Sequence, residues 1–335
     1  MTKRLSRRRA ILIAGAAAGM ALSPGLLRAS SGPGLHRWRG TALGADATIL
    51  LHHADRSAAD RLIGGCVAEI ERLEKIFSLY RRDSAVALLN REGVLDDPPL
   101  DLVRLLSESR GFWTLTGGAF DPTVQPLWDL YARHFDRPDA DPAGPDPHEI
   151  AAARSRIGFD RVDFDPGRVS FERPGMAVTF NGIAQGYITD RVADLLRGQG
   201  IERVLLELGE VRALGRHPDG RPWQVGLADP GDPRKTTRTI EIEDGAVATS
   251  GGYGTRFDAD GRHHHLFDPA TGLSANRYRS VSVEAPLATT ADALSTGFSA
   301  MPLGDARPVV AAAGRIEALF TLADGSTQVF GRRQG

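Results

Sequence analysis

The order of strand-like and helix-like segments in the second half of the chain constrains its fold more than any other feature. Two helix-like segments, at residues 181–200 and 290–301, enclose strand-like runs that follow one another without a helix between them. A doubly wound parallel sheet needs a crossover helix between successive strands. The pattern therefore predicts an α+β fold instead of a doubly wound one. The strand-like runs lie at residues 204–208, 223–227, 239–242 and 281–284.

Two helices and a proline-rich loop are expected in the first half of the chain. Apolar residues recur at helical spacing in residues 60–80, and a second helix is expected at residues 100–112. Residues 136–148 are rich in proline and aspartate, so we expect a surface loop there, at the boundary between two subdomains. Further strands are expected at residues 38–52, 162–171 and 176–180, and a closing hairpin at residues 318–322 and 327–330.

Residues 1–30 have the layout of an export signal. A basic start precedes an apolar run at residues 10–22, and small residues follow around Ala29. Three consecutive arginines after Ser6 resemble a twin-arginine signal, with an arginine-rich ordinary secretory signal as the alternative. The apolar run is too short to span a membrane. We therefore expect residues 31–335 to form a soluble periplasmic protein.

Net charge and cysteine content exclude two classes of function. The formal net charge is -1, so the chain has no general basic excess with which to neutralise nucleic-acid phosphates. Cys66 is the single cysteine, which rules out an intramolecular disulfide and a cysteine-based metal site. It lies in a helix-like run, and we expect it to be a buried small residue.

The stretch at residues 246–296 is dense in polar residues beside apolar, strand-like runs. Asp292 and Thr296 are four positions apart and share one helix face, where a carboxylate and a hydroxyl would suit Mg²⁺. A solvated or helix-capping aspartate is the alternative. His263, His264 and His265 are adjacent, so they cannot all point at one ion from a strand. We expect His265 to point into a site and the other two to lie on the surface.

A glycine-rich turn, NGIAQG at residues 181–186, opens a helix. Glycines let the backbone approach a ligand, and unpaired N–H groups at a helix start can receive a phosphate. A purely structural turn is the alternative. The chain has no HExxH, Walker A or GxSxG pattern, which weighs against zinc proteases, P-loop NTPases and serine hydrolases.

Seven stretches, taken in order, resemble the ApbE family of FAD:protein FMN transferases over about residues 38–301. The arginine-rich start and the runs NGIAQGYITDRVADLL and LGEVRALG are similar to the NosX branch, which serves nitrous-oxide respiration by flavinylating the membrane-bound NosR protein. The seven stretches are FSLYRRDSAVALLN, GAFDPTVQPL, NGIAQGYITD, LELGEVRALG with PDGRPWQVGLADP, AVATSGGY, HHLFDPATG and SVSVEAPLATTADALSTG.

The resemblance implies an α+β fold with a flavin-binding cleft between two subdomains and with the FAD diphosphate held over Mg²⁺. A threonine or serine hydroxyl of an acceptor protein would attack the flavin-side phosphorus, and AMP would leave. Asp292, Thr296 and the Gly182 carbonyl match the metal ligands, and His265 and Asp292 match the catalytic positions, with His265 as general base. The positions that match FAD contacts are Ser78, Ala119, Phe120, Asp121, Thr179, Gln185, Thr249, Ser250, Gly251 and Phe267.

The chain departs from the family pattern at several points. Thr179-Phe180 stands where Asp-Leu is common, Gln185 replaces a common Lys or Glu, and Ser295 replaces a second Asp found in some members. The usual Met-Gly-Thr start reads Arg-Gly-Thr at residues 39–41. Two alternatives to the transferase stay open: an enzyme that only hydrolyses FAD to FMN and AMP, and a non-catalytic flavin-binding protein that delivers cofactor to a partner.

Overall fold

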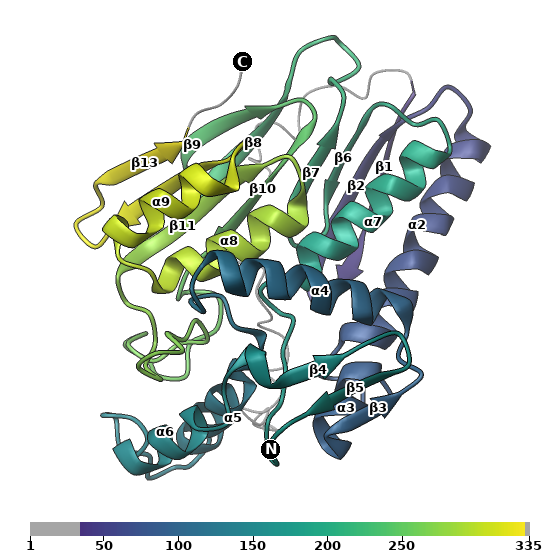
Figure 1. Cartoon of the computed structure of the whole chain (residues 1–335). Helices are drawn as coiled ribbons and strands as arrows, with labels where there is room; N and C mark the ends of the chain where they lie inside the picture. Colours follow the sequence, from purple (N-terminus) through teal and green to yellow (C-terminus); the bar gives the residue numbers. More distant parts are fainter. Residues whose placement is uncertain (1–33, 332–335) are drawn as a thin grey trace, which may run out of the picture.

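An eight-stranded antiparallel sheet forms the centre of the structure, a computed structural model that describes residues 34–331 (Figure 1). The strand order is β1-β2-β6-β7-β10-β11-β12-β13, and each neighbouring pair is antiparallel. The predicted α+β class is confirmed, because neighbours in this sheet need no crossover helix. The strands are β1 (Leu35–Ala42), β2 (Ala45–His52), β6 (Val204–Glu207), β7 (Val211–Leu214), β10 (Gly245–Ser250), β11 (Tyr278–Ala285), β12 (Glu317–Leu322) and β13 (Thr327–Gly331).

Helices cover one face of this sheet and a β-hairpin covers the other (Figure 1). Alternate residues of a strand point to opposite faces. Leu206 accordingly packs under the helices, while Leu205 packs against Trp223 of the hairpin. The helical layer consists of α2 (Arg56–Phe77), α4 (Leu100–Leu115), α7 (Ala184–Gly198), α8 (Ala288–Ala300) and α9 (Leu303–Ala313), and the hairpin of β8 (Trp223–Asp229) and β9 (Asp232–Ile242).

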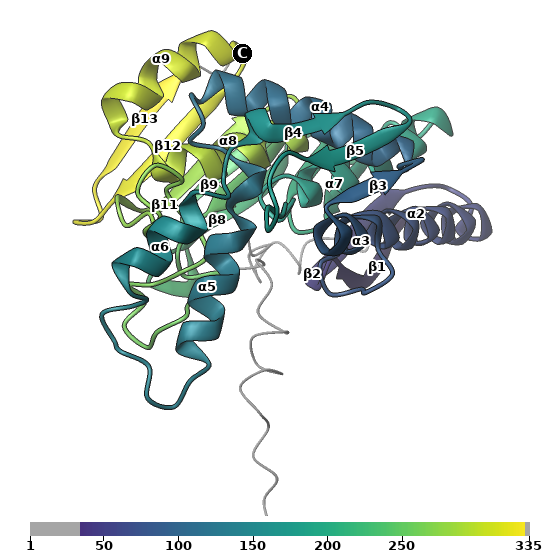
Figure 2. The same ribbon diagram turned by 60° about the horizontal axis from the view of Figure 1, so that its bottom comes forward.

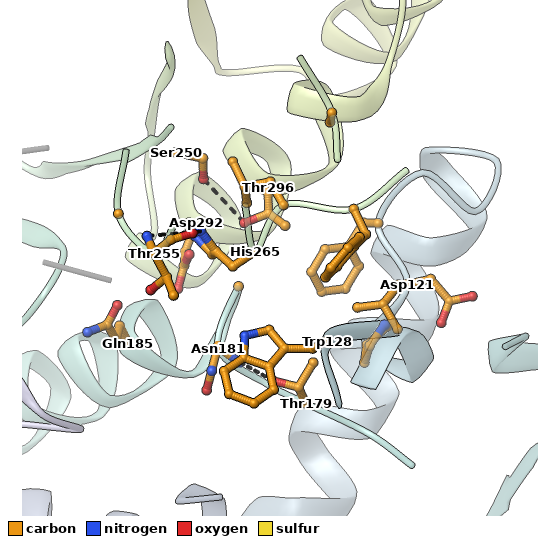
Figure 3. Close-up of a pocket in the computed structure, with 18 of the residues that line it drawn as sticks. Asp121, Trp128, Thr179, Asn181, Gln185, Ser250, Thr255, His265, Asp292 and Thr296 are labelled. Carbon is orange, nitrogen blue, oxygen red and sulfur yellow. Dashed lines mark hydrogen bonds between the residues drawn. The ribbon is translucent and has the colours of Figure 1, made fainter. Parts of the chain in front are cut away.

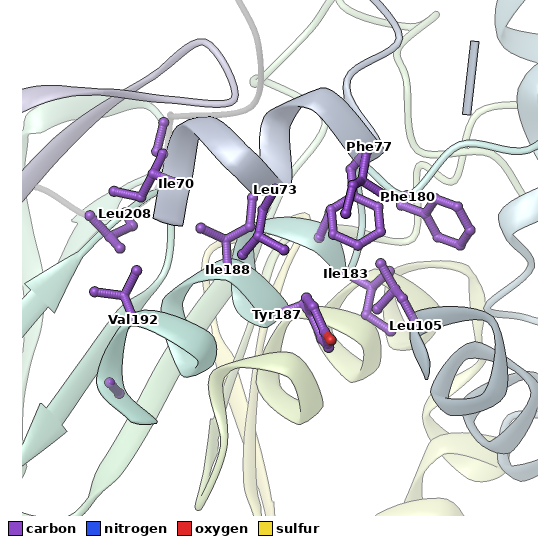
Figure 4. Packing of buried hydrophobic residues seen from close by; sticks show 14 of the residues in the cluster. Ile70, Leu73, Phe77, Leu105, Phe180, Ile183, Tyr187, Ile188, Val192 and Leu208 are labelled. Carbon is purple, nitrogen blue, oxygen red and sulfur yellow. The ribbon is translucent and has the colours of Figure 1, made fainter. Parts of the chain in front are cut away.

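The main core lies where α2 packs on α7 (Figure 4). Ile70, Leu73 and Phe77 recur at helical spacing on α2 and meet Tyr187 and Ile188 of α7. Burying one such side chain contributes about 1.5–3 kcal/mol. The helix expected at residues 60–80 is therefore present, beginning earlier because the Asp55 side chain accepts the Ser57 N–H as its N-cap. Cys66 is fully buried in this layer, as predicted.

The start of α8 is fixed by a side chain from α7. The carboxylate of Asp190 accepts the backbone N–H groups of Ala288 and Thr289 and the Thr289 hydroxyl. Helix starts leave such N–H groups without intrahelical partners, so Asp190 acts as a cap supplied by a neighbouring helix. These three hydrogen bonds fix the position of α8 relative to the first turns of α7.

The remaining elements form a second layer at one edge of the molecule. Figure 2 shows α5 and α6 side by side at one end of this layer, and α3 beside α2 at the other. The loop predicted at residues 136–148 joins α5 to α6, although its last two residues begin α6. Whether it separates two subdomains stays a prediction. The elements are α3 (Ala85–Glu92), β3 (Val94–Asp96), η2 (Pro122–Val124), α5 (Gln125–Phe135), α6 (Pro147–Arg154), η3 (Phe159–Arg161), β4 (Val162–Phe164) and β5 (Arg168–Phe171).

The expected strand at residues 176–180 is wrong. This segment is extended but joins no sheet, because the side chain of Asn90 takes the place of a neighbouring strand. Its Oδ1 accepts the Val178 N–H at 2.7 Å, and its Nδ2 donates to the Val178 carbonyl at 2.8 Å. The segment is thereby free to pass directly into the glycine-rich turn.

Two sequence predictions concern the chain ends. The signal-peptide interpretation of residues 1–30 lies outside the described residues. Between residues 34 and 331, each helix is too short or too polar to cross a membrane.

Candidate functional site

A pocket of about 1180 Å³, including its open mouth, lies between α8, the start of α7, the segment before α5 and the loop after β10 (Figure 3). Asp292, Thr296 and His265 gather on one side of it, and Trp128 and Thr179 lie on the other. The sequence-predicted residues that line it are Ala119, Phe120, Asp121, Thr179, Gly182, Gln185, Thr249, Ser250, Gly251, His265, Phe267, Asp292 and Thr296.

Ser78 is the predicted contact that does not line the pocket. It ends α2, where its Oγ accepts the Tyr80 N–H at 3.2 Å and its carbonyl accepts the Ser84 hydroxyl at 2.6 Å. These bonds turn the chain, and they bring Tyr80 to the pocket instead. The motif reaches the pocket through Tyr80, two positions later, and the contact between Ser78 and FAD stays a prediction.

Asp292 is held at the contact between α8 and α7. It is 3% exposed, and its Oδ2 accepts the backbone N–H of Gly186 at 3.0 Å. Burial raises the pKa of Asp292 to about 7. Gly186 is required here, since a Cβ would lie 2.3 Å from the Ala288 carbonyl oxygen. The carboxylate therefore points at a crossing where the two helix backbones touch.

Thr296 completes the same face of α8, four residues after Asp292. Its Oγ1 lies 3.3 Å from the Ser250 hydroxyl, which also bonds to Ser295 at 2.8 Å. A Cβ on Gly182 would lie 2.8 Å from Thr296 Oγ1, so the backbone of the glycine-rich turn lies against this side chain. The turn and α8, distant in sequence, thus meet where the sequence predicted a cation site.

The donor set at this place fits a hard cation. A carboxylate, a hydroxyl and a nearby backbone carbonyl are oxygen ligands of the kind that Mg²⁺ takes, and Mg²⁺ commonly obtains its other ligands from water and substrate phosphates. Within residues 34–331 there is no group of three His, Cys, Asp or Glu side chains that could hold a metal. A cation at Asp292 and Thr296 would therefore depend on ligand oxygens.

His265 lines the pocket beside the loop residue Thr255. Its Nδ1 lies 3.2 Å from both the backbone nitrogen and the carbonyl oxygen of Thr255. Burial lowers the pKa of His265 to about 4, so the imidazole is neutral at pH 7. In the tautomer whose Nδ1–H donates to the Thr255 carbonyl, the neutral imidazole can accept a proton at Nε2.

The prediction for the neighbouring histidines is wrong for His264. It is 2% exposed instead of lying on the surface, and its Nε2 is 3.1 Å from Asn276 Oδ1. The segment is a loop and not a strand, so adjacent side chains need not alternate between core and solvent. His263 is half-buried against the rings of Tyr131 and Phe135.

Sequence reasoning did not single out several residues that line the pocket. Trp128 lies within QPLWDLY, and its ring packs edge-on against Phe257. Glu210 lies within LGEVRALG and is buried, although an isolated glutamate beside a strand usually marks a solvated face. Burial first, and then the negative charge of Asp292, raise the pKa of Glu210 well above its usual range. Thr255, next to His265, was also missed.

The fold and the pocket place the chain among α+β proteins whose pocket lies where two helices meet the sheet. Oxygen donors stand at one side of the cleft and aromatic side chains at the other. Comparison with known proteins makes the assignment specific. The chain belongs to the ApbE family, whose model matches residues 43–320.

Individual relatives agree with this assignment. The FAD:protein FMN transferase of Vibrio cholerae is 35% identical over 260 residues, covering 75% of this chain and 76% of the relative. The enzyme of the same description from Treponema pallidum is 32% identical over 276 residues, covering 76% and 75%. The crystal structure of the ApbE protein from Thermotoga maritima superposes with a TM-score of 0.78 at 31% identity, covering 90% of this chain and 97% of that one.

Proposed function

We infer that this chain is an FAD:protein FMN transferase, which moves FMN from FAD to a threonine or serine hydroxyl of an acceptor protein and releases AMP. The observation that carries this inference is the convergence of Asp292, Thr296, Gly182 and His265, from three separate segments, on one pocket of a chain in the ApbE family. A protein that only binds FAD would need no more than the aromatic side of the pocket. The carboxylate, hydroxyl and imidazole opposite it are what transfer requires in addition.

Asp292, Thr296 and the backbone carbonyl of Gly182 would hold Mg²⁺. When bound, the cation neutralises charge on the FAD diphosphate, which is the main requirement of phosphoryl transfer. The bond between Asp292 and the Gly186 N–H keeps this carboxylate in place whether or not a ligand is present. The positive end of the α7 dipole, at the first turn of that helix, stabilises its negative charge.

His265 moves the proton in the proposed reaction. The acceptor oxygen forms a bond to the flavin-side phosphorus, the bond from this phosphorus to the bridging oxygen breaks, and AMP leaves with that oxygen and the electron pair. The acceptor's hydroxyl proton passes to the neutral imidazole of His265, which Thr255 orients through Nδ1. Such a base typically contributes 10²–10⁴-fold to the rate.

Trp128, Phe120 and Phe267 give the pocket aromatic surface against which the rings of FAD can pack.

The acceptor and the compartment are part of the same proposal. The similarity of residues 181–196 and 208–215 to the NosX branch supports a membrane-bound, NosR-like acceptor in nitrous-oxide respiration. The arginine-rich start of the chain supports export to the periplasm by the twin-arginine route. Replacing Arg7 and Arg8 together with lysine should then abolish export, and unchanged export would remove the twin-arginine proposal.

A single incubation separates the transferase from the two alternatives. The protein is mixed with FAD, Mg²⁺ and the soluble flavin-accepting domain of a NosR-like protein, and the acceptor is then denatured on a gel. Flavin fluorescence that stays with the denatured acceptor supports transfer. Free FMN with an unlabelled acceptor would indicate hydrolysis, and unchanged FAD would indicate a binding protein.

A further inference from the structure

Glu210 lines the pocket and has a buried carboxylate oxygen without a hydrogen-bond partner among the described residues. The residue is 6% exposed, and the oxygen without a partner is its Oε2. Its carboxyl receives a backbone hydrogen bond from Thr249. A buried carboxylate oxygen without a partner is costly and is rare in native proteins. The position therefore calls for a ligand.

The β6–β7 turn holds Glu210 firmly in this position. Leu208 donates its N–H to the Glu210 carbonyl at 3.0 Å, and Gly209 adopts a φ of +96° between them. A Cβ on Gly209 would lie 2.5 Å from Gln185 Nε2, so the turn is packed against the first turn of α7. Glu210 thus approaches the pocket from the sheet, while Asp292 approaches it from α8.

No positive side chain balances the two acids. The nearest buried cation in sequence, Arg212, pairs with Asp190 through Nε at 3.5 Å. Among the side chains described in residues 34–331, which exclude those of Pro233 and Arg234, none forms an ion pair with Glu210 or Asp292. Burial first, and then the negative charge of Glu210, raise the pKa of Tyr253, whose hydroxyl is buried without a hydrogen-bond partner among the described residues. A positively charged group from outside the chain would allow both buried acids to be ionised without an unbalanced charge.

We propose that Glu210 is a further group of the cation site, and that its carboxylate adds a second negative charge toward the divalent cation held by Asp292 and Thr296. The proposal rests on the proposed function only for the identity of the cation. The contact can be direct or through one water of the hydration shell of the ion, since Mg²⁺ usually keeps several waters. Side chains that contact the ligands or the bound waters of a metal ion change the affinity for that ion by about 10–100-fold.

Binding of Mn²⁺ alone, followed by the EPR signal of the free ion, tests the proposal without FAD or an acceptor. Glu210→Gln keeps the shape and removes the charge, and Glu243→Gln is the matched control, an exposed glutamate at the end of β9. We expect the dissociation constant of Mn²⁺ to rise about 10-fold or more for Glu210→Gln and to stay unchanged for Glu243→Gln. Glu210→Asp, which keeps the charge, should retain part of the affinity.

Thermal unfolding supplies the second readout. In the absence of metal, Glu210→Gln should melt at the wild-type temperature or above, because an acid that is costly to bury is replaced by a neutral amide of the same shape. Added Mg²⁺ should raise its Tm less than it raises that of the wild type. The proposal would be overturned if Glu210→Gln bound Mn²⁺ as tightly as the wild type does. It would also be overturned if this variant bound Mn²⁺ normally but lost affinity for FAD in the absence of metal. Either result would leave FMN transfer by the wild type, and so the proposed function, untouched.

Discussion

Asp292 on α8 accepts the backbone N–H of Gly186 on α7 at 3.0 Å, so one of its two carboxylate oxygens is engaged by the opening turn of another helix. The two helices cross where only glycine fits, and Asp190 caps α8 from the same helix one turn later. The carboxylate is therefore positioned by the fold before any ligand arrives. Preorganisation of this kind is what a transfer site requires.

Replacing Asp292 should affect the cation and the reaction together. Asp292→Asn keeps an oxygen that can accept the Gly186 N–H, so the fold should survive. The loss of the charge should lower Mg²⁺ affinity and reduce the transfer rate about 100-fold or more, as for removal of a group that stabilises charge in the transition state. Calorimetric Mg²⁺ titration and the labelling rate measure both. Asp305→Asn, on the exposed start of α9, is the control, and an Asp292→Asn protein as active as the control would contradict the assignment.

His265→Ala should slow transfer by about 10²–10⁴-fold with little change in FAD affinity. The imidazole accepts a proton in the reaction and is not needed to hold the nucleotide. Single-turnover labelling of the acceptor and fluorescence titration of FAD separate these two effects. His148→Ala, an exposed histidine on α6, should behave as the wild type. Unimpaired transfer by His265→Ala would remove its role as the base.

The stability of the protein should depend on pH through His265. Its pKa in the folded state is about 4, below the ordinary 6.5, because burial disfavours the charged ring. Between these pH values the unfolded chain binds more protons, so the contribution of His265 to the free energy of unfolding falls as the pH falls. At about 1.4 kcal/mol per pKa unit, the loss amounts to roughly 3 kcal/mol.

Urea unfolding at several pH values measures this effect as a difference between two proteins. The difference in unfolding free energy between wild type and His265→Gln should shrink as the pH falls from 6.5 to 4. The other buried groups, Asp292 and Glu210 included, titrate in both proteins, so their contributions cancel in the difference. A difference that is constant with pH would show that His265 is not buried as described.

Gly182→Ala should damage the site through simple overlap. The added Cβ would lie 2.8 Å from Thr296 Oγ1 and Cγ2, so Thr296 must move. Overpacking of this kind costs about 1–3 kcal/mol, and we expect Mg²⁺ affinity to fall about tenfold for each 1.4 kcal/mol that the displacement costs. Gly198→Ala, at the end of α7 where a Cβ meets open space, is the matched control. Equal Mg²⁺ affinity in the two variants would separate Gly182 from the cation site.

Sequence patterns predicted the long elements well because a single interaction dominates each of them. Helix α2 buries one apolar stripe, which repeated spacing indicates directly, whereas α8 is buried on nearly all sides. Strand β10 was missed, since the small and polar residues of AVATS have no strand signal. It exists because β7 and β11 pair with it on both sides, and those partners are distant in sequence.

The same distinction holds for the site. Asp292 and Thr296 share a helix, so spacing alone placed them together, whereas the family resemblance was needed to bring Gly182 and His265 into the same site. Glu210 has no sequence signal of its own, and its burial arises where the β6–β7 turn packs against α7. His264 was misplaced for a similar reason, because Asn276 and Ser274, further along the chain, supply its partners.

The mass of the acceptor after incubation with FAD and Mg²⁺ tests the central claim most directly. The account predicts that the intact NosR-like acceptor domain gains the mass of FMN less one water, that AMP appears in equal amount, and that replacing the labelled threonine or serine by alanine abolishes the gain. An acceptor of unchanged mass beside accumulating free FMN would contradict it, because the site would then be transferring the flavin phosphate to water.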